Sequence, residues 1–307
     1  LDKPDIYLDA KGETQIEMMA NIMVKFEREL TNYSPDIVLV PGDVNSSLAC
    51  ALVASRNGIK VGHIESGLRS FDRKMPEEIN RILIDDLSDF FFVTEQSGIN
   101  HLIKEGKEKN QIHMVGNTMI DSLVNFNNSI QKSNILKKIK CPEAYGLMTF
   151  HRPSNVDRKE TLSELINTIE KCCSSLTMVL PLHPRTKKSL EKHNLWAKFK
   201  SIKNLIYTDS LGYLDFMKLV TNSKIVITDS GGIQEETTFL QVPCITVREN
   251  TERPITIDMG NNELVQLNAS LISKRMIEKL NTTEKGEIPP FWDGHATERI
   301  LEILSTS

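Results

Sequence analysis

Hydrophobic residues in this chain fall into short continuous runs that alternate with longer stretches of mixed polarity. Runs of branched and aromatic residues predict buried strands, because a strand that is covered on both faces has no polar side. Strands are predicted at 37–40, 61–64, 90–93, 112–115, 147–150, 178–180, 225–227 and 243–247, most clearly in the apolar runs 37–40 and 225–227. Between the runs, apolar residues recur at the spacing of an amphipathic helix. Strands that alternate with helices predict parallel sheets covered by helices.

The alternation is interrupted once, at residues 128–142, which are polar and rich in lysine. A chain of 307 residues is long enough for about two domains. We therefore predict an α/β protein with two Rossmann-like domains, 1–141 and 142–307, that face each other across a cleft. The last amphipathic helix, at about 292–305, is expected to pack back towards the first domain. Ligands of parallel sheets bind beyond the carboxyl ends of the strands.

One stretch of the second domain joins a strand to a helix through a tight glycine turn. The apolar run 225–227 leads into Ser230, Gly231 and Gly232, and a segment that favours helix follows. Free backbone N–H groups and the positive end of a helix dipole favour an anion such as phosphate. Glu236 follows one helical turn later and is suited to accept hydrogen bonds from sugar hydroxyls. The same residues are equally typical of an ordinary connection in which Ser230 is the N-cap.

Three carboxylates lie at the predicted mouth of the first domain. Asp43 and Glu65 follow strands, and Glu77 stands at the start of a helix. Taken singly, each suits a turn, a cap or the helix dipole. Together at one cleft they suggest proton transfer.

Three further residues of the second domain are candidates for the same cleft. His151 follows a strand, although a single histidine is more often structural than catalytic. Arg253, in a loop after a strand, is suited either to a surface or structural salt bridge or to the ribose, base or phosphate of a nucleotide. Phe216 is suited to stacking on a base, or to the core face of its helix. A separate motif, Thr161 with Glu164, predicts a capping box at a helix start.

Composition and missing motifs argue against several classes of partner and cofactor. The net charge is −4, with no long basic block, which argues against nucleic acid as a partner. No run approaches the ~20 apolar residues that a membrane helix needs. The cysteines are odd in number, five, and none has zinc-ligand spacing, so we expect a reduced, cytoplasmic protein without a metal. Neither a Gly-x-Gly-x-x-Gly fingerprint nor a P-loop is present, so we expect no NAD and no other cofactor.

Several short motifs follow one another along nearly the whole chain. They are PGD at 41–43, GHIESGLR at 62–69, PEEINR at 76–81, GNTMID at 116–121, HRP at 151–153, TDSGGIQEE at 228–236 and TERP at 251–254. Each is weak alone, but in this order they resemble the non-hydrolysing UDP-N-acetylglucosamine 2-epimerases. The resemblance implies an architecture similar to GT-B glycosyltransferases, a UDP-sugar substrate and a homodimer.

The resemblance also assigns roles to individual residues. It matches Asp43, Glu65 and Glu77 to the catalytic carboxylates of the family, and His151 to its cleft histidine. The positions that it matches to UDP binding are Phe216, Ser230, Gly231, Gly232, Glu236 and Arg253. It further implies a first strand and a Gly-Thr-Arg-Pro-Glu loop with a lysine. The printed sequence lacks these, and we expect it to be an incomplete record that begins after them, so that the first domain lacks its first strand. Near residues 11–15 the sequence also looks shorter than the family's glycine-rich loop.

The reaction that the resemblance implies is inversion at C2 of UDP-N-acetylglucosamine. UDP is eliminated to give 2-acetamidoglucal and then added back with the proton on the other face. Four alternatives stay open: a hydrolysing epimerase, an epimerase of a UDP-2,3-diacetamido-uronate, a retaining glycosyltransferase and a non-catalytic nucleotide-sugar sensor.

Overall fold

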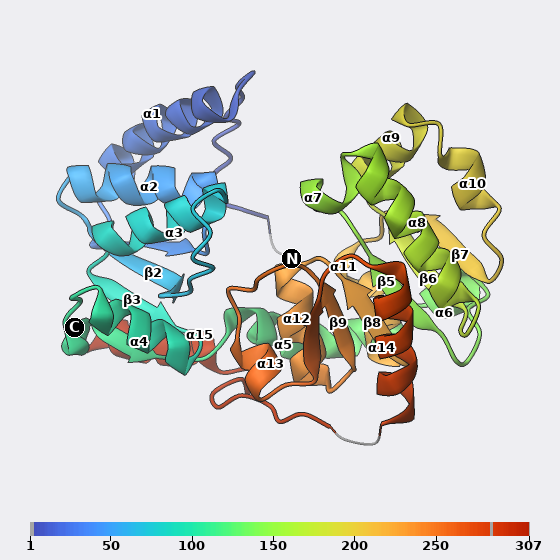
Figure 1. Cartoon of the computed structure of the whole chain (residues 1–307). Coiled ribbons are helices and arrows are strands. Elements are labelled where there is room, and N and C mark those ends of the chain that lie inside the picture. The colour runs from blue at the N-terminus through green and yellow to red at the C-terminus, as the bar shows by residue number, and fades with distance from the viewer. Residues whose placement is uncertain (1–2, 283–284, 307) are drawn as a thin grey trace. The chain divides into compact units, whose positions relative to one another are not determined.

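The computed structural model describes residues 3–282 and 285–306 of the chain (Figure 1). Packing divides the chain into two compact units. One runs to Asn117 and takes in the segment from His295, and the other spans Thr118–Gly294. Each unit is built around one parallel sheet, which confirms the predicted fold class of two Rossmann-like α/β domains.

The first unit contains a four-stranded parallel sheet in the order β1-β2-β3-β4. Its strands are β1 (Ile37–Pro41), β2 (Lys60–Ser66), β3 (Phe90–Val93) and β4 (Ile112–Met114). Its helices are α1 (Gln15–Tyr33), α2 (Asn45–Arg56), α3 (Pro76–Leu87), α4 (Gln96–Lys104), the 3₁₀ turn η1 (Lys109–Gln111) and α15 (Ala296–Ser305).

Helices cover both faces of the first sheet. Phe91 packs with α4 residue Leu102, whereas the next residue, Phe92, packs with Ile300 of α15. Successive side chains of a strand point to opposite faces, so α4 and α15 lie on opposite sides of β3. The C-terminal helix is thereby part of the core of the first unit.

The second unit contains a six-stranded parallel sheet in the order β10-β9-β8-β5-β6-β7. Its strands are β5 (Gly146–Thr149), β6 (Met178–Leu182), β7 (Leu205–Asp209), β8 (Ile225–Thr228), β9 (Cys244–Val247) and β10 (Asn262–Val265). Its helices are α5 (Thr118–Lys132), α6 (Ile135–Lys138), α7 (Pro153–Val156), α8 (Lys159–Cys173), α9 (Pro184–Lys192), α10 (Trp196–Lys200), α11 (Tyr213–Asn222), α12 (Gly231–Leu240), α13 (Ile255–Asp258) and α14 (Ala269–Asn281).

The central strand β8 contributes side chains to two hydrophobic clusters, one on each face of the sheet. Ile225 and Ile227 belong to a cluster that α8 and α14 complete, and Val226 belongs to a cluster that α5, α11 and α12 complete. All three side chains are fully buried. A strand buried on both faces needs apolar residues at every position, which is why this run does not alternate with polar residues.

The two helices directly before residue 142, α5 and α6, pack with the second unit. Ile130 of α5 and Ile135 of α6 are in one cluster with Leu147 of β5. The division at 141/142 stays a prediction about domains, and it falls inside the second compact unit. No helix among the described residues is both long and apolar enough to cross a bilayer.

Candidate active site

The strand order of the second sheet creates a switch point between β5 and β8. These strands are neighbours, but the chain continues from β5 to β6 on one side and from β8 to β9 on the other. The connections leave in opposite directions and open a crevice at the carboxyl ends of the two strands. His151 follows β5, and Ser230 follows β8. The structure thus brings these two predicted residues to one place.

A buried carboxylate, Asp229, joins the two strand ends. Its oxygens accept hydrogen bonds from the backbone N–H groups of His151 (3.0 Å) and Arg152 (2.9 Å) and from the side chain of Asn155 (3.1 Å). Its Oδ1 also lies 3.1 Å from Nδ1 of His151. Burial alone would raise the pKa of Asp229, but the hydrogen bond and charge of His151 and the other donors hold it below its usual value. Asp229 therefore orients the imidazole of His151 with Nε2 as the nitrogen left for a ligand.

A second histidine lies beside the first. The ring centres of His151 and His183 are 5.3 Å apart. Burial and then the charge of His151 lower the pKa of His183. Nδ1 of His183 accepts the N–H of Arg185 and caps α9, so we assign it a structural role.

The glycine turn forms the N-terminus of α12. Ser230 occupies the N-cap position, but its side chain makes no capping hydrogen bond. Its own N–H donates to the hydroxyl of Thr228 at 3.0 Å. The alternative of an ordinary serine cap therefore lacks the bond that defines it. The first-turn N–H groups of a helix have no partner within the helix and can serve an anion.

Arg253 lies against this helix start. A Cβ on Gly231 would be 3.0 Å from Nη1 of Arg253 and 2.9 Å from Oε1 of Glu252. The guanidinium also forms ion pairs with Glu252 and, at 2.8 Å, with Glu235. Glu252 in turn pairs with Arg248 at 2.8 Å. The ion-pair alternative for Arg253 is thus realised, and the same pairs fix its positive charge beside the glycine turn.

The pKa of Glu252 reflects these partners. Burial raises it, but the charges of Arg253 and Arg248 bring it well below its usual value. Glu252 is therefore ionised near neutral pH and keeps Arg253 in place.

Glu236 lies one turn into α12 and is almost fully buried, with 3% of its surface exposed. Burial raises the pKa of its carboxyl group to about 7, against a hydrogen bond with Tyr213 that lowers it. Tyr213 is the first residue of α11. Phe216, one turn further along α11, is half-buried and packs against the apolar cluster under α12. The core alternative for Phe216 holds for at least part of its ring.

In the first unit, Asp43 is held by α3. It follows Gly42, whose φ of +60° falls in the left-handed region that glycine adopts without strain. Nη2 of Arg81 pairs with Oδ2 of Asp43, and Nη1 of Arg81 donates to Glu78 at 3.0 Å. A buried guanidinium therefore links the β1–α2 turn to the helix.

Glu65 lies beside this turn because of a bulge in β2. The register between β2 and β3 shifts between Ile64 and Ser66, and Glu65 has a φ of +69°. This conformation costs a non-glycine residue about 1–2 kcal/mol, and strain of this kind gathers at functional sites. Oε2 of Glu65 lies 3.5 Å from the place that a Cβ on Gly42 would take. The structure thus places Glu65 next to the turn that carries Asp43.

The two neighbouring glutamates at the start of α3 differ. Glu77 is exposed, whereas Glu78 is buried and accepts hydrogen bonds from Ser70, Phe71 and Arg81. Glu77 and Arg81 are four residues apart and share one face of α3. Glu77 is therefore available for chemistry, and Glu78 for structure.

A sequence-family model described as UDP-N-acetylglucosamine 2-epimerase matches residues 1–305 of the chain. The chain belongs to this family.

Relatives and solved structures agree with the family. The chain is 40% identical to a UDP-N-acetylglucosamine 2-epimerase of Methanocaldococcus jannaschii, over 99% of this chain and 85% of that protein. It is 35% identical to a UDP-2,3-diacetamido-2,3-dideoxy-D-glucuronate 2-epimerase of Pseudomonas aeruginosa, over 99% of this chain and 84% of that protein. A crystal structure of the M. jannaschii enzyme with UDP-GlcNAc and UDP superposes with a TM-score of 0.93, covering 100% of this chain and 86% of that one.

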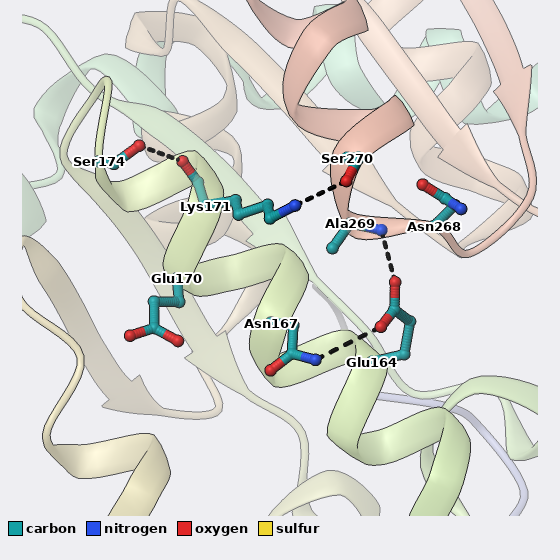
Figure 2. Close-up of a pocket in the computed structure, with 8 residues that line it drawn as sticks. All are labelled: Glu164, Asn167, Glu170, Lys171, Ser174, Asn268, Ala269 and Ser270. Atoms are coloured by element: carbon teal, nitrogen blue, oxygen red, sulfur yellow. Dashed lines mark hydrogen bonds between the residues drawn. The ribbon is translucent and has the colours of Figure 1, made fainter.

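A polar pocket of about 510 Å³ between α8 and α14 contains none of the residues matched to the epimerase family (Figure 2). Its side chains bond to each other. Oε1 of Glu164 accepts the N–H of Ala269 at 2.7 Å, and Lys171 donates to Ser270 at 2.6 Å. The pocket is therefore part of the packing interface between α8 and α14. The predicted capping box at Thr161 is wrong, because α8 already begins at Lys159. Glu164 instead accepts the N–H of Ala269, the first residue of α14.

Sequence reasoning missed three residues that hold candidate residues of the two units. Asp229 contacts His151, and Arg81 pairs with Asp43. Tyr213 forms a hydrogen bond with Glu236. Asp229 carried a signal, since a charged residue so close after the apolar run 225–227 must be either solvated or well bonded. The other two depend on contacts between distant segments.

Proposed function

We propose that this protein inverts C2 of UDP-N-acetylglucosamine to give UDP-N-acetylmannosamine. The observation that carries the proposal is the switch-point site, where the start of α12, Arg253 and Glu236 offer partners for a diphosphate and a ribose. It is supported by membership of the family and by the M. jannaschii relative, which was crystallised with UDP-GlcNAc and UDP.

In the proposed reaction, a carboxylate removes the C2 proton while the bond from C1 to the UDP oxygen breaks. The electron pair of the C–H bond forms the C1=C2 double bond of 2-acetamidoglucal, and UDP leaves with its negative charge. In the return step, UDP attacks C1 and a protonated carboxyl group delivers a proton to the opposite face of C2. Asp43, Glu65 and Glu77 are the proposed proton carriers, and their order of action is left open.

The departing UDP needs stabilisation. We assign the diphosphate to the turn formed by Ser230, Gly231 and Gly232. The N–H of Ser230 is bonded to Thr228, so the N–H groups that follow it in the first turn of α12 would stabilise the developing charge. Arg253 adds a positive charge that Glu235 and Glu252 keep in place.

The remaining residues of the second unit take the other parts of the ligand. Glu236 is assigned to the ribose hydroxyls and Phe216 to the base. His151, oriented by Asp229, is assigned to the leaving phosphate or the sugar.

Incubation with UDP-N-acetylglucosamine in deuterated water tests the proposal. We expect a mixture of the two epimers with deuterium at C2, measured by NMR and mass spectrometry. Asp43→Asn and Glu65→Gln are each expected to lower kcat by more than about a hundredfold. Recovery of unlabelled substrate alone, with wild-type protein that binds UDP, would contradict the epimerase and favour the sensor.

A second candidate is the epimerisation of a UDP-2,3-diacetamido-uronate, which the P. aeruginosa relative favours. Both substrates would share the UDP site and the carboxylates. The ratio of kcat/KM for the two sugars decides between them. A ratio of at least about tenfold in favour of UDP-N-acetylglucosamine is expected.

We also propose that the protein acts in the cytoplasm as a homodimer, as the family resemblance implies. All five cysteines are free thiols, which fits a reducing compartment. Light scattering of the purified protein tests the dimer, and a mass of one chain would contradict it.

A further inference from the structure

His63 of β2 is completely buried and contacts two acceptors. Its Nδ1 lies 2.6 Å from Oδ1 of Asp85 on α3. Its Nε2 lies 3.0 Å from the carbonyl oxygen of Gly42. The imidazole thus bridges a helix and the turn that precedes Asp43.

Each of the two contacts requires a hydrogen on the ring nitrogen that makes it. A carbonyl oxygen can only accept, so Nε2 of His63 must donate to Gly42. Asp85 is ionised, because Arg69 lies 2.7 Å from its second oxygen and the N–H of Gly67 donates to the same atom. Burial raises the pKa of Asp85, but the charges of His63 and Arg69 bring it below the usual value. Nδ1 must therefore donate as well, and the ring is an imidazolium.

The surrounding charges balance. Asp85 of α3 faces His63, Arg69 faces Asp85, and Glu105, which follows α4, accepts a hydrogen bond from Arg69 at 2.9 Å. Two cations thus alternate with two anions in a connected chain. A buried charge persists when it is paired and hydrogen-bonded in this way.

Gly42 is held at both of its polar groups. Its N–H donates to the carbonyl of Ile64 at 2.9 Å, and its carbonyl accepts from His63. Both partners belong to β2, the strand that also carries Glu65. The next residue after Gly42 is Asp43. His63 therefore ties the turn that carries one proposed proton carrier to the strand that carries another.

We propose that His63 is a positioning residue, an imidazolium that locks the Gly42 turn to Asp85 and so fixes Asp43 relative to Glu65. The proposal rests on the proposed function, because these carboxylates are the groups that would move the C2 proton. His63 itself is enclosed by protein and needs no contact with the substrate. A small displacement of a reacting group is enough to slow a reaction strongly.

The protonation state is tested in the wild-type protein, without reference to activity. With ¹⁵N-labelled histidine, NMR is expected to show two ring N–H signals for His63. They are assigned by their loss in His63→Gln or, if that variant does not fold, by their change in Asp85→Asn, which alters the partner of Nδ1. His113, half-buried in the same unit with a pKa lowered by burial, serves as an internal comparison. A single N–H on the His63 ring would overturn the proposal.

Kinetics test the positioning role. Glutamine at position 63 can reach one acceptor but not both, so His63→Gln is expected to lower kcat by about tenfold or more. KM and the affinity for UDP should stay within about threefold, because ground-state binding is untouched. His113→Gln is the matched control and should keep wild-type kinetics. A folded His63→Gln with wild-type kcat would overturn the proposal, as would an equal loss of UDP binding.

The two hypotheses fail in different ways. Absence of C2 exchange in the wild type would defeat the proposed function and leave the NMR result readable. Normal exchange in the wild type with an unchanged His63→Gln would defeat only the positioning role. If His63→Gln does not fold, the ring signals of the wild type decide, since two N–H groups support the imidazolium and one rejects it.

Discussion

Arg253 lies directly against Gly231, the first residue of α12. Its Nη1 is 3.0 Å from the position that a Cβ on Gly231 would occupy. A side chain there would displace the guanidinium together with its partner Glu252, because Oε1 of Glu252 lies 2.9 Å from the same position and pairs with Nη1 of Arg253. Packing alone therefore favours glycine at this position.

Gly231→Ala is expected to weaken UDP binding by at least about tenfold, since the guanidinium must move from the proposed phosphate site. Calorimetric titration with UDP measures the effect. Gly212→Ala is the matched control, because a Cβ at Gly212 meets no atom within 4 Å. Equal UDP affinities for the two variants would reject the role given to Arg253.

The ionisation of Glu236 predicts the pH dependence of UDP binding. The pKa of this carboxyl group is raised to about 7, and the ionised form is the better acceptor for ribose hydroxyls. Affinity should therefore rise as the pH increases towards 7 and level off above it, by up to about tenfold per unit. Titrations from pH 5.5 to 8.5 measure the profile. Glu236→Gln should flatten it, and a wild-type slope in that variant would reject the assignment.

The same group predicts a change of stability with the opposite sign. Its folded pKa is above the unfolded value of 4.5, so its favourable contribution is complete below pH 4.5 and is lost as the pH rises through about 7. The full shift corresponds to about 3 kcal/mol. Chemical denaturation at pH 5.5 and 8.5 should show a smaller loss for Glu236→Gln than for the wild type. An equal loss would show that other groups set the pH dependence.

Asp229→Asn should destabilise the second unit. The amide cannot accept all of the bonds that the two carboxylate oxygens receive, and it leaves buried donors unpaired. The expected cost is about 2–4 kcal/mol in the free energy of unfolding. Asp209→Asn is the control, because that carboxylate is 87% exposed in a surface pair with Lys187, where pairs contribute about 0–1 kcal/mol. Similar values for both variants would contradict the account of Asp229.

Glu77→Gln is expected to affect turnover, whereas Glu78→Gln is expected to affect the stability of the fold. Glu77 is exposed, so its substitution should lower kcat by about a hundredfold or more and leave stability unchanged. Glu78 is buried under four hydrogen bonds, so its substitution should cost about 1–3 kcal/mol of stability. Denaturation and turnover of both variants measure the contrast. The reverse pattern would move the catalytic assignment to Glu78.

The sequence was sufficient for the local elements and for the candidate positions. Continuous apolar runs such as 225–227 have to be buried on both faces, and this alone predicts parallel strands. Because parallel strands share one carboxyl edge, residues such as His151 and Ser230 were predictable as neighbours at that edge. The order of short motifs added the family.

Only the tertiary structure decided which partners hold these residues. Arg81 pairs with Asp43, and Asp229 orients His151. His63 joins Gly42 to Asp85. Each of these contacts joins segments that are separated in sequence. Adjacent glutamates 77 and 78 have the same chemistry, and their difference comes from the direction each faces on α3. Local pattern reports which side chains must avoid water, whereas the pairing of charges depends on where the folded chain brings distant segments together.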